Sequence, residues 1–259
     1  MIKLHLNNIL FLLGVSFFCI SFIGCGIIPQ TELQDASTLE KGQSTISITP
    51  SPFFECRYQV GIAERSDISV TGYANAFVFF LKWYETGLKF QWKQTLSSPM
   101  SKNKWALLFS GQAYATRFKY GGLIDGPPDN EAKFEAVSPS FGIIYSREVN
   151  FDPFKDWEDR LSGWRLFRRF PWLKVQTIYL GIKTSWMYSE GRYHEIVNPS
   201  SSLVSRQDVF VFPFVGIVAG ERGRFRIEIG AANYVNTYEH APRIIFYPSV
   251  TMTYPLGEN

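Results

Sequence analysis

The chain has 259 residues and a formal net charge of +3, from 26 lysines and arginines against 23 acidic residues. This near balance argues against nucleic acid or an acidic substrate as a partner. Aromatic residues make up 17% of the chain, a surplus that suits a wide apolar surface, either in a core or at a membrane.

The first 24 residues have the pattern of an export signal. Ile9 to Gly24 is an uncharged run of sixteen mostly apolar residues, and Lys3 is the only lysine or arginine before it. A membrane-spanning helix needs about 20 such residues. The run therefore fits the apolar region of a signal peptide; the alternative is an N-terminal membrane anchor that stays attached.

The four residues that end this run, Phe22-Ile23-Gly24-Cys25, resemble the lipobox of bacterial lipoproteins. The resemblance implies cleavage before Cys25, diacylglycerol on its thiol and an acyl chain such as palmitate on its amine. Two or more acyl chains hold a protein stably at a membrane. In this family an Asp after the cysteine often means retention in the inner membrane, so Gly26 favours the outer membrane of the cell envelope.

The sequence predicts three segments: a signal peptide at 1–24, a lipidated Cys25 with a flexible tether to residue 50, and a β-barrel domain at 51–259. The tether is rich in Ser, Thr, Gln and charged residues. Its last part, Ser44 to Thr49, alternates weakly and is a possible first strand. After cleavage Cys56 has no disulfide partner in the domain.

From residue 54 onward, apolar and polar residues alternate with a period of two, which is typical of strands with one face in an apolar medium. The clearest run, 87–95, sets three large apolar side chains against two lysines and a glutamine. Loops are predicted at 121–130 and 197–207 from their Gly, Pro, Asp and Ser content. The predicted strands are 54–62, 68–76, 87–95, 105–119, 134–147, 173–188, 209–219, 224–234 and 243–254.

Residues 156 to 172 break this period. Trp157, Leu161 and Trp164 lie near helical spacing, with arginines between them, and predict a short amphipathic helix inserted between two strands. The helix would either lie on the membrane surface or cap one end of the β domain.

The fold class that these runs predict is all-β, an antiparallel up-and-down β-barrel of eight to ten strands. Nine runs are clear, and 44–49 would make ten; single-chain bacterial barrels have even strand numbers. Four runs exceed the roughly 9–11 residues that a tilted strand needs to cross a bilayer. From about 54 to 254 the chain therefore resembles small outer-membrane β-barrel proteins, with apolar stripes facing lipid and polar stripes enclosing a small interior.

Residues that usually carry catalysis or bind metals are scarce. After cleavage only His194 and His240 remain, and the sequence has no cysteine cluster, phosphate loop, Gly-x-Ser-x-Gly or HExxH motif. His194 lies near Ser189 and the serines at 200–202, but catalytic triads are recognised by geometry rather than by proximity in sequence. The sequence therefore predicts no enzyme activity, cofactor or metal site, and Cys25 is its one predicted site residue.

The leading functional hypothesis is a lipid-anchored outer-membrane barrel with a structural, interaction or small-ligand role. Its predicted partner is membrane lipid, through Cys25 and the barrel surface, and a protein partner is not identified. One alternative is a lipid-modifying barrel enzyme with His194 as base. Another is a soluble periplasmic barrel, held only by its lipid, whose apolar stripes point inward around a hydrophobic ligand. With eight to ten strands, no wide pore is expected.

Overall fold

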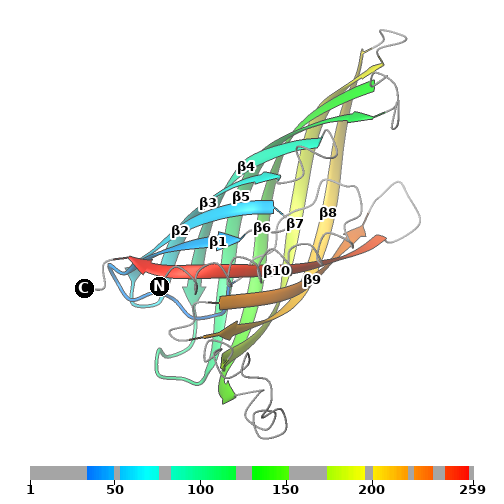
Figure 1. Ribbon diagram of the computed structural model, residues 1–259. Helices are drawn as coiled ribbons and strands as arrows, with labels where there is room; N and C mark the ends of the chain where they lie inside the picture. The colour runs from blue at the N-terminus through cyan, green and yellow to red at the C-terminus, as the bar shows by residue number, and fades with distance from the viewer. Residues whose placement is uncertain are drawn as a thin grey trace, which may run out of the picture.

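The computed structural model contains a closed barrel of ten antiparallel strands (Figure 1). It describes residues 34–49, 53–75, 83–120, 130–151, 174–195, 201–220, 225–235 and 243–256. Each strand pairs with its neighbours along the chain, and the first pairs with the last to close the barrel. The strands are β1 (Ser44–Thr49), β2 (Phe53–Ala63), β3 (Ser66–Asn75), β4 (Trp83–Thr95), β5 (Asn103–Tyr120), β6 (Asn130–Phe151), β7 (Val175–Glu195), β8 (Ser201–Ala219), β9 (Phe225–Val235) and β10 (Arg243–Leu256).

This architecture confirms the predicted all-β, up-and-down barrel at the upper end of the expected strand count. The possible strand at 44–49 is present as β1, which pairs with β10 on one side and with β2 on the other. The barrel therefore begins before residue 51. Ten strands also satisfy the even number expected of a single-chain bacterial barrel.

No helix occurs among the described residues, so none of them forms a helix of the length and hydropathy that a membrane span requires. The helix predicted at 156–172 lies outside the described ranges, and the structure gives it no support. The signal peptide at 1–24 and Cys25 also lie outside them. These assignments stay predictions from the sequence.

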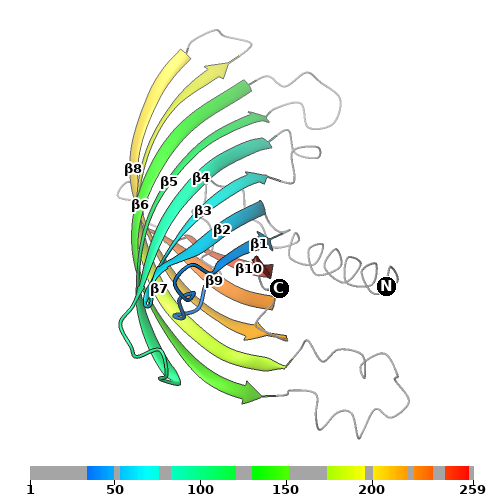
Figure 2. The same ribbon diagram turned by 90° about the vertical axis from the view of Figure 1, so that its left-hand side faces the viewer.

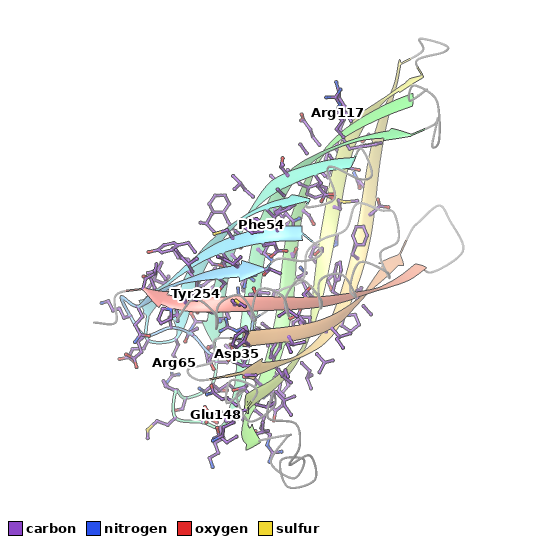
Figure 3. The ribbon with its side chains drawn as sticks, in the orientation of Figure 1. Asp35, Phe54, Arg65, Arg117, Glu148 and Tyr254 are labelled. Atoms are coloured by element: carbon purple, nitrogen blue, oxygen red, sulfur yellow. The ribbon has the colours of Figure 1, made fainter. Side chains whose placement is uncertain are left out.

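The barrel wall is taller on one side than on the other. Strands β5 to β8 have 18 to 22 residues, whereas β1 has six and β2 has eleven. Figures 1 and 2 show the long strands reaching well beyond the short ones at one end, which we call the far end. The opposite end, the turn end, carries the tight turn at Glu64 and Arg65 and the connection at 96–102. Figure 3 places Arg65 and Glu148 at the turn end and Arg117 toward the far end.

The loop predicted at 197–207 is wrong for its second part. Residues 201–207 belong to β8 and pair with residues 188–194 of β7. Serine-rich composition favours loops in general, but here the backbone bonds to β7 keep the segment extended. Cross-strand pairing of this kind outweighs intrinsic preference.

Side chains alternate sharply between the two faces of the wall. On β4, Phe90 is 60% exposed and Trp92 41% exposed, whereas Lys89 and Lys93 are 1% and 2% exposed. Because successive side chains of a strand point to opposite faces, one stripe lies outside the barrel and the other inside. Phe54, labelled in Figure 3, belongs to the outer stripe and is about half exposed.

Candidate functional site in the barrel lumen

The polar wall of the lumen is formed by the inward faces of β2, β3, β4 and β9. Lys93 Nζ lies 3.4 Å from the carboxylate of Asp67, which also accepts a 2.8 Å hydrogen bond from Gln59 Nε2. Ser69 Oγ donates to Gln91 Oε1 at 3.2 Å. Six acidic and four basic side chains are buried among the described residues. Some of these charges are paired within the wall, as Lys93 is with Asp67, and others are not.

The facing wall, contributed by β5 to β8 near the turn end, is apolar. The residues share near-complete burial, at 7% exposure or less, and pack together in one cluster. Tyr179 is the one member with a polar end, and its hydroxyl donates to Glu228 Oε2 at 3.2 Å. The members from the wall are Ala106, Leu108, Ile144, Tyr179, Phe214 and Val218.

Toward the far end, aromatic side chains project into the lumen and contact one another. Tyr73, Tyr114, Met187, Phe210 and Phe212 belong to a second buried cluster. The hydroxyl of Tyr73 accepts a 3.0 Å hydrogen bond from Gln112, and the hydroxyl of Tyr114 donates to the sulfur of Met187. Within the described residues, this part of the lumen therefore holds a packed aromatic cluster.

The segment that precedes β1, residues 34–43, enters the lumen at the turn end. Gln34, Asp35 and Ala36 are 2%, 6% and 0% exposed. Ala36 packs in the apolar cluster of β5 to β8, whereas its two neighbours contact the polar wall. The sequence predicts this segment as part of the tether, because nothing in its composition distinguishes it from a solvated linker.

The segment leaves the lumen through a turn that depends on two glycines. Gly42 has a φ of +86°, which favours glycine, and its N–H donates to Gly61 O at 2.8 Å. A Cβ on Gly61 would lie 2.1 Å from the carbonyl oxygen of Glu40. The close passage of the segment over β2 therefore requires glycine at 61.

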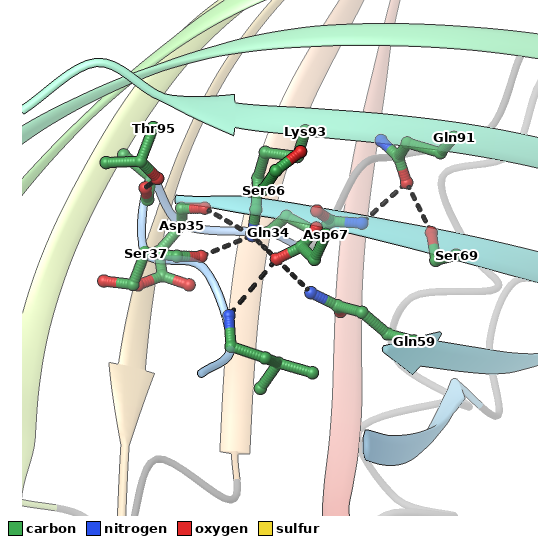
Figure 4. A network of polar contacts seen from close by, with 12 residues as sticks. Gln34, Asp35, Ser37, Gln59, Ser66, Asp67, Ser69, Gln91, Lys93 and Thr95 are labelled. Carbon is green, nitrogen blue, oxygen red and sulfur yellow. Dashed lines mark hydrogen bonds and ion pairs between the residues drawn. The ribbon is translucent and has the colours of Figure 1, made fainter. Parts of the chain in front are cut away.

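Polar side chains of β4 hold the backbone of this segment (Figure 4). Lys93 Nζ donates to the carbonyl oxygens of Asp35 and Ser37. With Asp67 these carbonyls make three acceptors for the three N–H groups of the ammonium. Thr95 Oγ1 donates to the carbonyl oxygen of Ala36 at 2.6 Å. Three consecutive carbonyls are therefore bound by two side chains of one strand.

Side chains of the segment make their own contacts across the lumen. Gln34 Nε2 donates to Gln91 Oε1 at 2.6 Å, and Asp35 Oδ1 lies 3.6 Å from Arg226 Nη2 on β9. Burial raises the pKa of Asp35, but the nearby charges of Arg226 and Lys93 and hydrogen bonds from Ser37 outweigh it, so the pKa is lowered. Asp35 is therefore an ionised group that links β4 to β9.

The residues singled out from the sequence have the following places. Cys25 and His240 lie outside the described residues. The backbones of His194 and Ser201 pair across β7 and β8, and the structure describes neither side chain. Cys56 is exposed on the outer face and forms no disulfide. Within the described ranges, no group of three or more His, Cys, Asp or Glu residues is placed to hold a metal ion.

The alternation in the sequence predicts the inward stripe that carries Lys93, but not the contact of Lys93 with residues 34–37. That contact joins residues far apart in the chain, so no local sequence pattern predicts it. A scan of protein-family models and a search of curated proteins found no match to this chain.

Proposed function

We propose that this protein is an integral β-barrel of the bacterial outer membrane, additionally anchored by lipid on Cys25, with a structural or interaction role. The observation that carries the proposal is the distribution of polarity across the wall. Large apolar side chains cover the outside, and the buried side chains of β2, β3 and β4 are mainly charged or polar. A soluble protein has the reverse arrangement, whereas a membrane barrel has this one.

The outer surface also carries a continuous aromatic band across β4, β5 and β6. The ring centroids of Trp92 and Phe109 are 5.3 Å apart, and those of Phe109 and Phe141 are 5.0 Å apart. Monomeric soluble proteins rarely expose contiguous apolar patches of this kind. Nearer the turn end, the ring of Tyr145 contacts that of Trp105 at a tilt of 50°, and its hydroxyl donates a hydrogen bond to Asn103. Aromatic rings with one polar partner are typical of the membrane–water interface.

The alternatives receive less support. A tethered soluble barrel needs its apolar stripes inside, around a ligand, and the stripe that includes Phe90 and Trp92 lies outside. The two side-chain clusters inside the lumen favour a structural or interaction role over passage of a solute. For an enzyme, the candidate base would be His194, whose side chain lies outside what the structure describes.

The test separates the barrel from its lipid anchor. Residues 1–25 are replaced by the signal peptide of an ordinary secreted protein, so that the domain is exported without a lipidated cysteine. We expect the unlipidated protein to stay in the outer-membrane fraction through alkaline carbonate washing and to require detergent for release. Recovery in the aqueous periplasmic fraction as a folded protein would contradict the proposal and revive the tethered soluble barrel.

A further inference from the structure

The segment inside the turn end is bound as a peptide is bound by a receptor. Its backbone carbonyls are held by Lys93 and Thr95, and its carboxylate is held by Arg226. The methyl group of Ala36 packs against the apolar wall. Backbone, charge and shape are thus recognised together, as in a peptide-binding groove.

The binding groups also keep partners within the wall itself. Lys93 is paired with Asp67, Arg226 Nη1 donates to Thr253 at 2.6 Å, and Gln91 accepts from Ser69. Departure of the segment would leave each of these three groups with a wall partner. A core residue, by contrast, would leave an uncompensated cavity.

From residue 34 to β1, the described path of the chain permits such a departure. The segment precedes β1, so it is not threaded between two strands of the barrel. Its exit over Gly61 at the turn end rests on the hydrogen bonds of Gly42 and Gln43. Withdrawal therefore breaks contacts in the lumen without opening any strand ladder.

We propose that residues 34–39 are a removable plug. They occupy a cradle formed by Gln91, Lys93, Thr95 and Arg226, which accepts an extended peptide with an acidic residue followed by small residues. While the plug is bound in cis, it shuts the turn end of the lumen to water-soluble molecules. The cradle is a binding site for an acidic peptide that the chain itself fills.

The first experiment measures protection of a thiol placed behind the plug. Ser69 is suited to this, because its hydroxyl bonds the same Gln91 oxygen that accepts from Gln34. The full chain with Cys56→Ser and Ser69→Cys is purified in detergent and treated with a charged maleimide. The Cys56→Ser chain alone gives the background.

Labelling of the reporter should be slow in this parent and at least about tenfold faster with Asp35→Lys, because the buried pair with Arg226 is replaced by repulsion. The matched control is Glu40→Lys, which makes the same charge change on an exposed part of the segment. It should leave the rate within about twofold. Equal rates for the parent, Asp35→Lys and Glu40→Lys in folded barrels would overturn the plug.

The second experiment supplies the plug in trans. In the full chain carrying the reporter, residues 34–39 are deleted, and folding is checked by circular dichroism and by heat-dependent gel mobility. We expect fast labelling, slowed again by a synthetic peptide of residues 33–40 but not by the same peptide with Lys at position 35. Failure of the peptide to protect would overturn the cradle as a binding site. A deletion variant and an Asp35→Lys variant that both fail to fold would show a fixed core element rather than a removable plug.

Discussion

The two walls that face each other across the turn end of the lumen hold the segment before β1 through different kinds of interaction. The polar wall binds Asp35 through Lys93 and Arg226. The apolar wall packs Ala36 against side chains of β5 to β8. Directional bonds set the position of the segment along the lumen, while the apolar wall provides shape and excludes water.

The comparison shows that the inside of a barrel is not uniform. The polar wall contains charges with a compensating partner close by, as Asp67 has in Lys93. A charge introduced on the apolar wall would find few polar groups near it apart from the Tyr179 hydroxyl. The same substitution should therefore reduce the free energy of unfolding by different amounts on the two walls.

The largest effect is expected from Leu108→Asp on the apolar wall. Leu108 is 1% exposed within the apolar cluster, so an ionised carboxylate there lacks compensation and should cost about 3–5 kcal/mol of folding free energy or prevent folding. Urea unfolding followed by tryptophan fluorescence measures this cost. The control is Ser69→Asp on β3 of the polar wall, at a position that is 4% exposed. Equal costs would mean that the two walls do not differ.

On the polar wall, Lys93→Met should destabilise the barrel by about 3 kcal/mol, because Asp67 stays buried without its cation. Asp67→Asn in the same background should recover part of that loss. A double-mutant cycle on urea midpoints tests this, with a coupling of about 1–3 kcal/mol expected. Strict additivity of the two single variants would show that the pair contributes nothing.

A smaller effect is expected from steric crowding in the apolar wall. A Cβ on Gly216 would lie 2.2 Å from the ring of Tyr179, whereas a Cβ on Gly111 of β5 meets nothing within 4 Å. Gly216→Ala should therefore cost about 1–3 kcal/mol through displacement of the ring. Gly111→Ala serves as the control and should be nearly neutral in the same unfolding measurement. A neutral Gly216→Ala would indicate that Tyr179 moves freely and that this wall is loosely packed.

The smallest effect should appear in the pH dependence of the plug. The pKa of Asp35 is lowered in the folded protein, so its ionised form contributes stability fully above its ordinary pKa of 3.8. That contribution is lost as the pH falls through the lowered folded value. The stability difference between the parent and Asp35→Asn should be constant from neutral pH to about pH 5 and then shrink. A difference that already falls between pH 7 and pH 5 would contradict the lowered pKa.

The sequence by itself determined the barrel, nearly all of its strands and the direction of the stripe on β4. Phe90 and Trp92 lie outside and Lys89 and Lys93 inside, as the period of two predicts, because the pleat of a strand makes side-chain direction a local property. The sequence was less informative for β7. There, Ile178, Leu180 and Ile182 face outward, and Val175 and Tyr179 face inward. Where both stripes contain apolar residues, hydropathy alone does not reveal an apolar patch inside the lumen.

Only the tertiary structure decided three features: the assignment of 201–207 to β8, the apolar wall and the place of residues 34–43. Each depends on partners distant in the chain, as when Lys93 and Arg226 meet at Asp35. The segment has neither strand nor helix periodicity, and polar residues of its kind usually form solvated linkers. Its burial follows from closure of the barrel, which brings β4 and β9 around a common space. The local sequence of the segment does not indicate that closure.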